Sequence, residues 1–283
     1  MLRWVLKHWR EFFRSLLWAL GAIFLPLEAY EVLKNGDITL SLPGFLAVAL
    51  IPGTVLFFLD GYLFSGFLRR EVTIPNPTND TKIRLKFGNI FEEQGWKAIG
   101  ANDFFDSIVD EDLVSSKSLH GHVLSTYWQG DREDWRNQVN ASLRNVQGTK
   151  ESRPKGNRLR YPIGTTARAC TADQKFLFVA LGKTDAANNV TSANAEILIK
   201  AVRGMAAEAR AACSMEPLSV PLMGSGLSRV GIKNSALVDL IITAILEEGR
   251  DGQITGEVNI VLPEAKAHEI NLKNHVRNWT NGQ

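Results

Sequence analysis

Phe176-Leu-Phe-Val-Ala-Leu181 is a short, continuous apolar run, which is typical of a strand buried on both faces in the centre of a sheet. A helix is predicted next, over 192–213, because its apolar residues recur at helical spacing. The chain then predicts a strand over 217–222, a helix over 232–248 and a strand over 257–262. Strands that alternate with helices in this order require a largely parallel sheet between layers of helices.

The sequence before this core extends the same pattern. Lys82-Ile-Arg-Leu-Lys-Phe87 alternates charged and apolar residues, as a half-buried strand does, and residues 95–101 predict a second strand that ends at Asn102. Helices are predicted over 115–129 and 131–144. The predicted fold class is therefore α/β, with a mixed, largely parallel sheet flanked by helices. The polar tail after Pro263 is expected at the periphery.

Composition excludes several classes of protein. The chain has 32 Lys and Arg against 30 Asp and Glu, a net charge of +2 and a hydrophobic share of 45%, so it is neither disordered nor a strongly basic nucleic-acid binder. We therefore expect no nucleic-acid partner. Its two cysteines cannot form a disulfide framework or a cysteine-only zinc site, and no HExxH motif occurs. We expect neither a metal nor a cofactor.

The first 70 residues contain two apolar segments. Residues 38–59 carry no charge and would span roughly 33 Å as a helix, which is enough to cross the hydrocarbon core. A shorter apolar segment begins at about residue 15 and extends to Leu33. We predict two transmembrane helices, over about 15–33 and 38–59, joined by the turn Lys34-Asn35-Gly36-Asp37. The alternatives are a buried core helix for the second segment and a signal peptide for the first, which lacks a small-residue cleavage site.

Basic residues set the expected orientation of this hairpin. Both flanks are basic: Arg3, Lys7, Arg10 and Arg14 precede the first span, and Arg69 and Arg70 follow the second. By the positive-inside rule both ends lie in the cytoplasm. We thus expect residues 1–70 to form a membrane region and residues 71–283 a cytoplasmic domain. Asp60, just past the second span, is expected at the interface, with a pore-lining position as the alternative.

A glycine-rich loop is the first candidate binding segment. Pro221-Leu-Met-Gly-Ser-Gly-Leu-Ser-Arg-Val-Gly231 links a predicted buried strand to a helix, where ligands of such sheets bind. Its glycines permit close backbone approach, and its N–H groups can bind an anion at a helix start. The alternative is a flexible connection, and the loop is no P-loop because it lacks Gly-Lys-Ser/Thr. The candidate ligand-binding residues are Met223, Gly224, Ser225, Gly226, Leu227, Ser228 and Arg229.

Residues 100–110, which follow another predicted strand, form the second candidate. Asn102 and Asp106 have the chemistry to hydrogen-bond sugar hydroxyls, and Phe104 or Phe105 could stack on a base. The alternative is a capped helix start with both Phe rings in the core.

The third candidate is Ser118-Leu-His-Gly-His122, in which His120, beside Gly121, could contact a ligand or titrate. The alternative is a histidine whose hydrogen bonds are satisfied within the fold or by solvent.

Together these segments resemble a macro domain, the ADP-ribose-binding α/β fold, over roughly 71–262. The similarity runs from Lys82-Ile-Arg-Leu-Lys-Phe-Gly-Asn-Ile90 through Ala101-Asn102 to the glycine-rich loop. It implies that Asn89 replaces the family's adenine-contacting Asp and that Asn102 contacts the distal ribose. The family's glycine run after this Asn is absent, which counts against hydrolysis of ADP-ribosyl groups.

Two membrane spans before such a domain resemble more specifically the transmembrane–macro effectors of type II Thoeris anti-phage defence. NDFFDSIVD at 102–110, SLHGHV at 118–123 and VPLMGSGLS at 220–228 carry this similarity. It implies a non-enzymatic effector at the inner membrane that binds a nucleotide-derived signal, a histidine-linked ADP-ribose, made by a TIR-domain partner enzyme. Signal binding would drive homo-oligomerisation, disruption of the bilayer and abortive infection. Two alternatives remain: a membrane-anchored ADP-ribosyl hydrolase, with Asn102 and Asp106 placing the water, and a non-toxic ADP-ribose recognition module.

Overall fold

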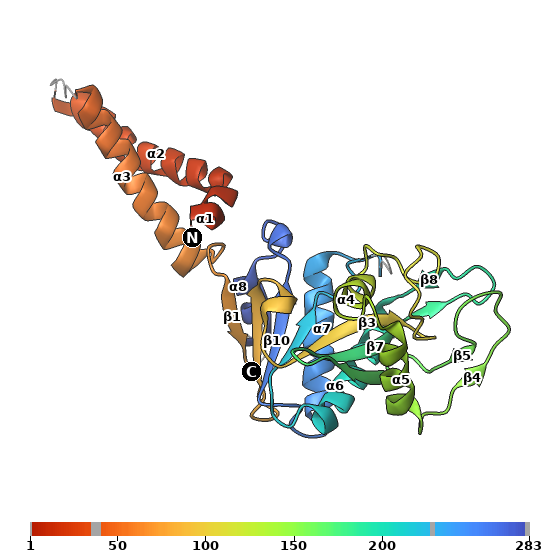
Figure 1. Cartoon of the computed structure of the whole chain (residues 1–283). Coiled ribbons are helices and arrows are strands. Elements are labelled where there is room, and N and C mark those ends of the chain that lie inside the picture. Colours follow the sequence, from red (N-terminus) through yellow and green to blue (C-terminus); the bar gives the residue numbers. More distant parts are fainter. Residues whose placement is uncertain (1, 35–40, 227–229, 281–283) are drawn as a thin grey trace. The chain divides into compact units, whose positions relative to one another are not determined.

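The computed structural model describes residues 2–34, 41–226 and 230–280 (Figure 1). The chain divides into two compact units. The hairpin unit comprises Met1–Val72 and Asn271–Arg277, and the sheet unit comprises Thr73–Ile270 and Asn278–Gln283.

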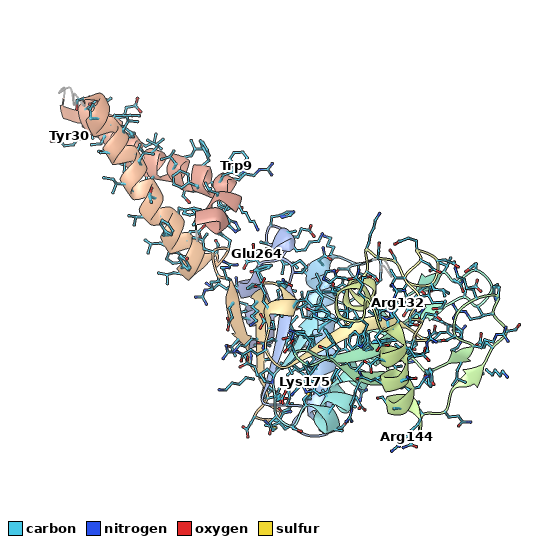
Figure 2. All side chains as sticks on the ribbon, in the orientation of Figure 1. Trp9, Tyr30, Arg132, Arg144, Lys175 and Glu264 are labelled. Atoms are coloured by element: carbon cyan, nitrogen blue, oxygen red, sulfur yellow. The ribbon has the colours of Figure 1, made fainter. Side chains whose placement is uncertain are left out.

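The hairpin unit is built from α1 (Leu2–Lys7), α2 (Trp9–Lys34), α3 (Leu42–Leu59) and the short π-helix η1 (Asp60–Phe64). Ser41 caps α3, because its hydroxyl accepts a hydrogen bond from the Gly44 N–H at 3.3 Å. α2 and α3 pack against each other along their length. Trp9 and Tyr30, toward opposite ends of α2, are each more than half exposed (Figure 2).

Two helices of this unit are long and apolar enough to cross a membrane, over Trp9–Leu33 and Pro43–Phe64. Only 6% and 22% of their apolar windows are buried, whereas the core helix of a globular domain is mostly buried. Both expected apolar helices are therefore present, and the first begins earlier than predicted. The predicted turn at residues 34–37 falls mainly outside the described residues. Asp60 is paired inside the unit: its carboxylate accepts from the Ser65 hydroxyl at 2.5 Å and from Arg14 at 3.4 Å.

The C-terminal helix α8 (Leu272–Thr280) also contributes to the hairpin unit. Asn271 Nδ2 donates to the Ser65 carbonyl at 2.8 Å, and Lys273 Nζ donates to the carbonyls of Leu63 and Phe64, each at 2.5 Å. These carbonyls belong to the end of η1, where a helix leaves acceptors without partners. The expectation of a peripheral tail is wrong for this helix, since Leu272 is also buried.

The sheet unit contains an eight-stranded mixed sheet. Its order is β1-β2-β10-β9-β3-β7-β6, and β8 pairs with β7. Five neighbouring strands are parallel: β2 (Lys82–Phe87), β10 (Glu257–Leu262), β9 (Leu218–Pro221), β3 (Trp96–Asn102) and β7 (Lys175–Thr184). β6 (Thr166–Cys170) and β8 (Thr191–Ser192) are antiparallel to β7, and β1 (Glu71–Ile74) is the other edge. The predicted fold class is confirmed, and the run from Phe176 lies in β7, which pairs with β3 on one side and with β6 on the other.

Helices flank this sheet on both faces. α4 (Leu119–Tyr127) and α5 (Arg132–Leu143) share a core with Phe176 and Phe178 of β7, and this core contains Trp128 and Trp135. α6 (Ala195–Ala212) packs on β7 and against α7 (Asn234–Gly249) (Figure 1). Between α5 and β6 the chain makes an excursion that contains only the short pair β4 (Thr149–Lys150) and β5 (Leu159–Arg160).

Candidate functional site

Two cavities lie at the carboxyl ends of the parallel strands, where open α/β sheets bind their ligands. They share the walls formed by Gly100, Ser118 and Leu181. The larger, here named the loop pocket, has a volume of about 420 Å³ and is lined by the glycine-rich loop, the start of α4 and Pro263. The smaller, here named the acidic pocket, has a volume of about 190 Å³ and is lined by the end of β3, residues 111–115, His120, Asn189 and Thr191.

The loop pocket brings together groups that suit an anion. Lys117 supplies a positive charge next to the N-terminus of α4, whose Ser118 cap accepts from the Gly121 N–H at 2.9 Å. Gly224 has a φ of +81°, and a Cβ there would lie 2.7 Å from the Val230 side chain, so this position requires glycine. In the part of the chain that the structure describes, no atom lies within 4 Å of a Cβ position at Gly226, so this glycine leaves open space in the pocket wall.

The structure places four predicted residues of the glycine-rich loop in this wall: Met223, Gly224, Ser225 and Gly226. The Ser225 hydroxyl donates to the Leu222 carbonyl at 2.7 Å and so helps to fix the loop. The predicted residues Leu227, Ser228 and Arg229 lie outside the described part of the chain. Gly121 is not a wall residue: it is buried in the first turn of α4, and a Cβ there would lie 2.2 Å from the Ser115 carbonyl oxygen.

His120 lines the acidic pocket from the first turn of α4. Its side chain is buried, and its ring lies 5.5 Å from both the Trp135 and the Phe178 rings. Burial among these rings lowers the pKa of His120 to about 3, so the imidazole is neutral at physiological pH. Among the described residues, its Nε2 has no hydrogen-bond partner. A buried polar atom without a partner is costly, so Nε2 is a natural contact for a ligand.

Two carboxylates give the acidic pocket its charge. Glu111, at a φ of 67°, accepts from the Ser115 hydroxyl at 2.7 Å and the Ser116 N–H at 2.9 Å. These hydrogen bonds, Ser116's foremost, lower the pKa of Glu111 to about 2, so it stays ionised. Asp112 accepts from Asn189 Nδ2 at 3.2 Å. Lys155 Nζ lies 3.4 Å from Asp112 Oδ2 and offsets part of this charge, so the wall owes its net negative charge mainly to Glu111 and favours a neutral or cationic group over an anion.

Asn102 and Asp106 take different positions. Asn102 lines the acidic pocket, whereas Asp106, only 1% exposed, lies behind it. Asn102 Nδ2 donates to Asp106 Oδ2 at 2.9 Å, and the Asp106 N–H donates to Asn102 Oδ1 at 3.1 Å. The Asp106 carboxylate also accepts from Arg153 at 3.0 Å and from the Asn157 N–H at 2.7 Å. It therefore supports Asn102, and the structure does not bring it to a pocket wall.

Phe104 and Phe105 pack in the interior, which was the alternative to base stacking. The guanidinium groups of Arg153 and Arg160 lie over the Phe104 ring, at 4.0 and 4.6 Å from its centroid. Phe105, with a φ of 50°, packs edge-on to Tyr161. Neither ring lines the loop pocket or the acidic pocket, and residues 103–110 form turns and irregular chain where the alternative expected a helix start.

Asn89 follows β2 at the same edge of the sheet but lines neither pocket. Its Oδ1 accepts from the Phe91 N–H at 3.1 Å and its Nδ2 donates to Glu92 at 3.1 Å, so it caps the short helix η2 (Ile90–Glu92).

Sequence reasoning missed part of the acidic pocket, namely Glu111, Asp112, Ser115, Asn189 and Thr191. The only available signal for Glu111 and Asp112 was their place in a long connection after a buried strand, where functional residues gather.

Replacing His120 with Phe should remove a specific pH dependence of stability. Below pH 6.5 the unfolded chain takes up a proton that the folded chain excludes, so stability falls as the pH drops toward 3. Between pH 7 and pH 5, the free energy of unfolding should fall by ~2 kcal/mol more in the wild-type chain than in His120→Phe. Urea unfolding followed by tryptophan fluorescence at both pH values measures this difference. Parallel pH profiles for the two proteins would contradict it.

Comparison with known proteins identifies a family with a similar sequence. Residues 83–263 match the family model described as Thoeris protein ThsA, Macro domain. Thoeris protein ThsA of Bacillus amyloliquefaciens (strain Y2) is 24% identical over 156 residues, which cover 53% of this chain and 51% of that protein. The chain thus spans about half the length of the curated relative it matches.

Solved structures show the same fold. Two single-substitution variants of the Oceanobacillus iheyensis macrodomain superpose with TM-scores of 0.50 and 0.51, at 13% and 12% identity. They cover 74% and 76% of this chain, and 100% and 97% of their own length is matched. At this identity the similarity establishes the fold and nothing finer.

Proposed function

Because the chain belongs to the family of Thoeris ThsA macro domains, we propose that it binds an ADP-ribose-derived signal in the two joined pockets and acts on a membrane through its N-terminal hairpin. The observation that carries the proposal is the shared wall at Gly100, Ser118 and Leu181. It joins a pocket suited to an anion to a pocket that holds a buried histidine nitrogen without a partner.

The diphosphate is assigned to the loop pocket. Loop N–H groups, Lys117 and the N-terminus of α4 can share its charge there, as helix N-termini do for phosphates. The distal ribose then extends toward Asn102, and the group linked to it occupies the acidic pocket. The wall of Glu111 and Asp112 favours a conjugate with an amine or imidazole over one with only an added carboxylate. A histidine-linked ADP-ribose meets this requirement.

The proposed role is that of a sensor and effector, with no turnover of the ligand. A general base must be free to take a proton, but the Asp106 carboxylate already accepts from three donors and lies behind the pocket. We further propose that the signal comes from a TIR-domain enzyme and that its binding assembles several copies whose hairpins disrupt the bilayer, which ends in abortive infection. For this, the ligand must bind the assembled state more tightly than the resting one.

Titration of the full chain in nanodiscs with ADP-ribose, histidine-linked ADP-ribose and ADP tests the binding step. The conjugate should bind more tightly than ADP-ribose, and chromatography of the titrated mixture should recover it intact. The absence of a heat of binding for all three ligands would refute the proposed function. Release of free ADP-ribose from the conjugate would instead favour the hydrolase.

A charge at the middle of α3 should abolish the membrane step. Leu50 lies near the centre of α3 and is 44% exposed, so Leu50→Arg should cost about 3 kcal/mol of insertion. Less protein should fractionate with membranes, and growth arrest on signal production should be lost. Leu50→Phe is the matched control, because it keeps the segment apolar and should behave as wild type. Unchanged fractionation and arrest for Leu50→Arg would contradict a spanning role for α3.

A further inference from the structure

Arg153 is a fully buried arginine from the excursion between β4 and β5, and it lines neither pocket. Its guanidinium group makes three hydrogen bonds. Nη1 donates to Asp106 Oδ2 at 3.0 Å and to the Asn157 carbonyl at 2.9 Å, and Nη2 donates to Asn189 Oδ1 at 2.7 Å. One planar group therefore joins Asp106, which bonds the wall residue Asn102, to the wall residue Asn189.

Both branches end on residues of the pocket wall. Through Asp106, Arg153 is connected to Asn102, whose amide is fixed in one orientation because its nitrogen donates to Asp106 and its oxygen accepts from the Asp106 N–H. The other branch is the hydrogen bond from Arg153 Nη2 to Asn189 Oδ1. Because it fixes the amide oxygen, Asn189 Nδ2 is turned toward the Asp112 carboxylate, to which it donates at 3.2 Å. Among the described residues, Asn102 Nδ2 donates only to Asp106, so its second N–H is available for a ligand.

The backbone around this bridge is held in conformations that need support. Glu111 and Asn189 both have positive φ, at 67° and 60°. Such conformations persist in residues other than glycine only when their surroundings fix them. The loop around Arg153 is fixed in turn, because Asn157 Nδ2 donates to the carbonyls of Phe104 and Phe105 at 3.0 and 2.7 Å.

From these contacts we infer that Arg153 is a positioning residue for ligand recognition: its two-branched bridge sets the orientation of the Asn102 and Asn189 amides and so gives the acidic pocket its specificity. This inference rests on the proposed function. It adds that recognition of the distal part of the ligand depends on a side chain that the ligand does not touch, while the loop pocket has no connection to Arg153 through these hydrogen bonds.

Arg160 provides a matched control. Its guanidinium group also lies over the Phe104 ring, at 4.6 Å from the centroid, and pairs with the buried carboxylate of Asp103 at 2.5 Å. Its other partners are Glu151 and the Thr184 carbonyl, so none of its hydrogen bonds reaches a pocket wall. Arg153→Lys and Arg160→Lys each keep a positive charge beside a buried aspartate. Each also removes one of the two guanidinium groups that lie over the Phe104 ring. They differ in whether the lost guanidinium group bonds a wall residue directly: Arg153 donates to Asn189, whereas Arg160 reaches the wall residue Thr191 only through Thr184.

The test measures dissociation constants of the full chain in nanodiscs for two probes. ADP fits the loop pocket alone, whereas ADP-ribose extends into the acidic pocket. Arg153→Lys should weaken ADP-ribose binding roughly tenfold, the equivalent of one lost hydrogen bond, and leave ADP binding within about twofold. Arg160→Lys should leave both constants near those of the wild type. Asn189→Gly, which suits the positive φ and keeps the Arg153–Asp106 pair, should show the same selective loss and decides the matter if Arg153→Lys does not fold.

Three results would overturn the inference. One is wild-type affinity for ADP-ribose in Arg153→Lys or, if that variant does not fold, in Asn189→Gly. Another is equal loss of ADP and ADP-ribose binding, which would make Arg153 a purely structural residue. The third is the same selective loss in Arg160→Lys. A wild-type chain that binds neither probe would refute the proposed function as well, and is thereby distinguished from these results.

Discussion

Gly226→Glu is expected to weaken binding of ADP-ribose and its conjugates at least ~100-fold while leaving the fold intact. Gly226 lines the loop pocket, and no atom of the described residues lies within 4 Å of a Cβ position there, so a Cβ can be added without a clash with them in the free protein. That side chain fills the space assigned to the diphosphate, and its carboxylate repels the phosphates. Like charges brought together on binding cost several kcal/mol, and about 2.7 kcal/mol suffices for a hundredfold loss.

Two neighbouring variants make this result interpretable. Gly226→Ala adds one methyl group to open space and should bind within a few-fold of wild type. Gly224→Ala should instead lose stability, because its φ of +81° is unfavourable for alanine and the new methyl would lie 2.7 Å from Val230. Calorimetry and thermal unfolding of all three separate occlusion from misfolding. Full ligand affinity in Gly226→Glu would show that the anion does not bind at this loop.

Asp106→Ala should destabilise the sheet unit by about 3–5 kcal/mol, because it leaves the fully buried Arg153 without its counter-charge. For a unit of this size the melting temperature should fall by roughly 10 °C. The hydrogen bonds of Asn102 Nδ2 and of the Asn157 N–H to this carboxylate are lost at the same time. Ligand binding should fail as a consequence of the altered interior.

Glu208→Ala is the matched control for this substitution. Glu208 forms a carboxylate–arginine pair with Arg168 at the surface, with side chains 29% and 42% exposed. Its removal should cost less than about 1 kcal/mol. Differential scanning fluorimetry of both variants measures the contrast. Equal melting temperatures for Asp106→Ala and wild type would show that the buried pair contributes no stability.

The elements that the sequence predicted well are those whose burial follows a simple period. β2 and β10 have the predicted bounds, and α5 and α6 lie within a few residues of them. β6 was missed because Thr166–Cys170 contains small residues and an arginine, with no alternation of large apolar side chains to mark a strand.

In the candidate site too, the residues that could be predicted are those marked by a local sequence pattern. The glycine-rich loop was found because its chemistry is local: glycines, a preceding strand and a following helix. The roles of Asp106 and Phe104 could not be found in the same way, because they depend on Arg153, which is 47 residues from Asp106 and has no local pattern around it. A carboxylate beside an asparagine has the same appearance in sequence whether it faces a ligand or a buried guanidinium group.

Because α8 contributes to the hairpin unit, the polypeptide passes from one unit to the other three times, after Val72, after Ile270 and after Arg277. The hairpin unit is therefore assembled from two segments that are almost 200 residues apart in the sequence. Asn271 and Lys273 donate hydrogen bonds to carbonyls at the end of η1. A protease cut after Val72 would thus leave residues 1–72 bound to the rest of the polypeptide by these hydrogen bonds, although no covalent link would remain.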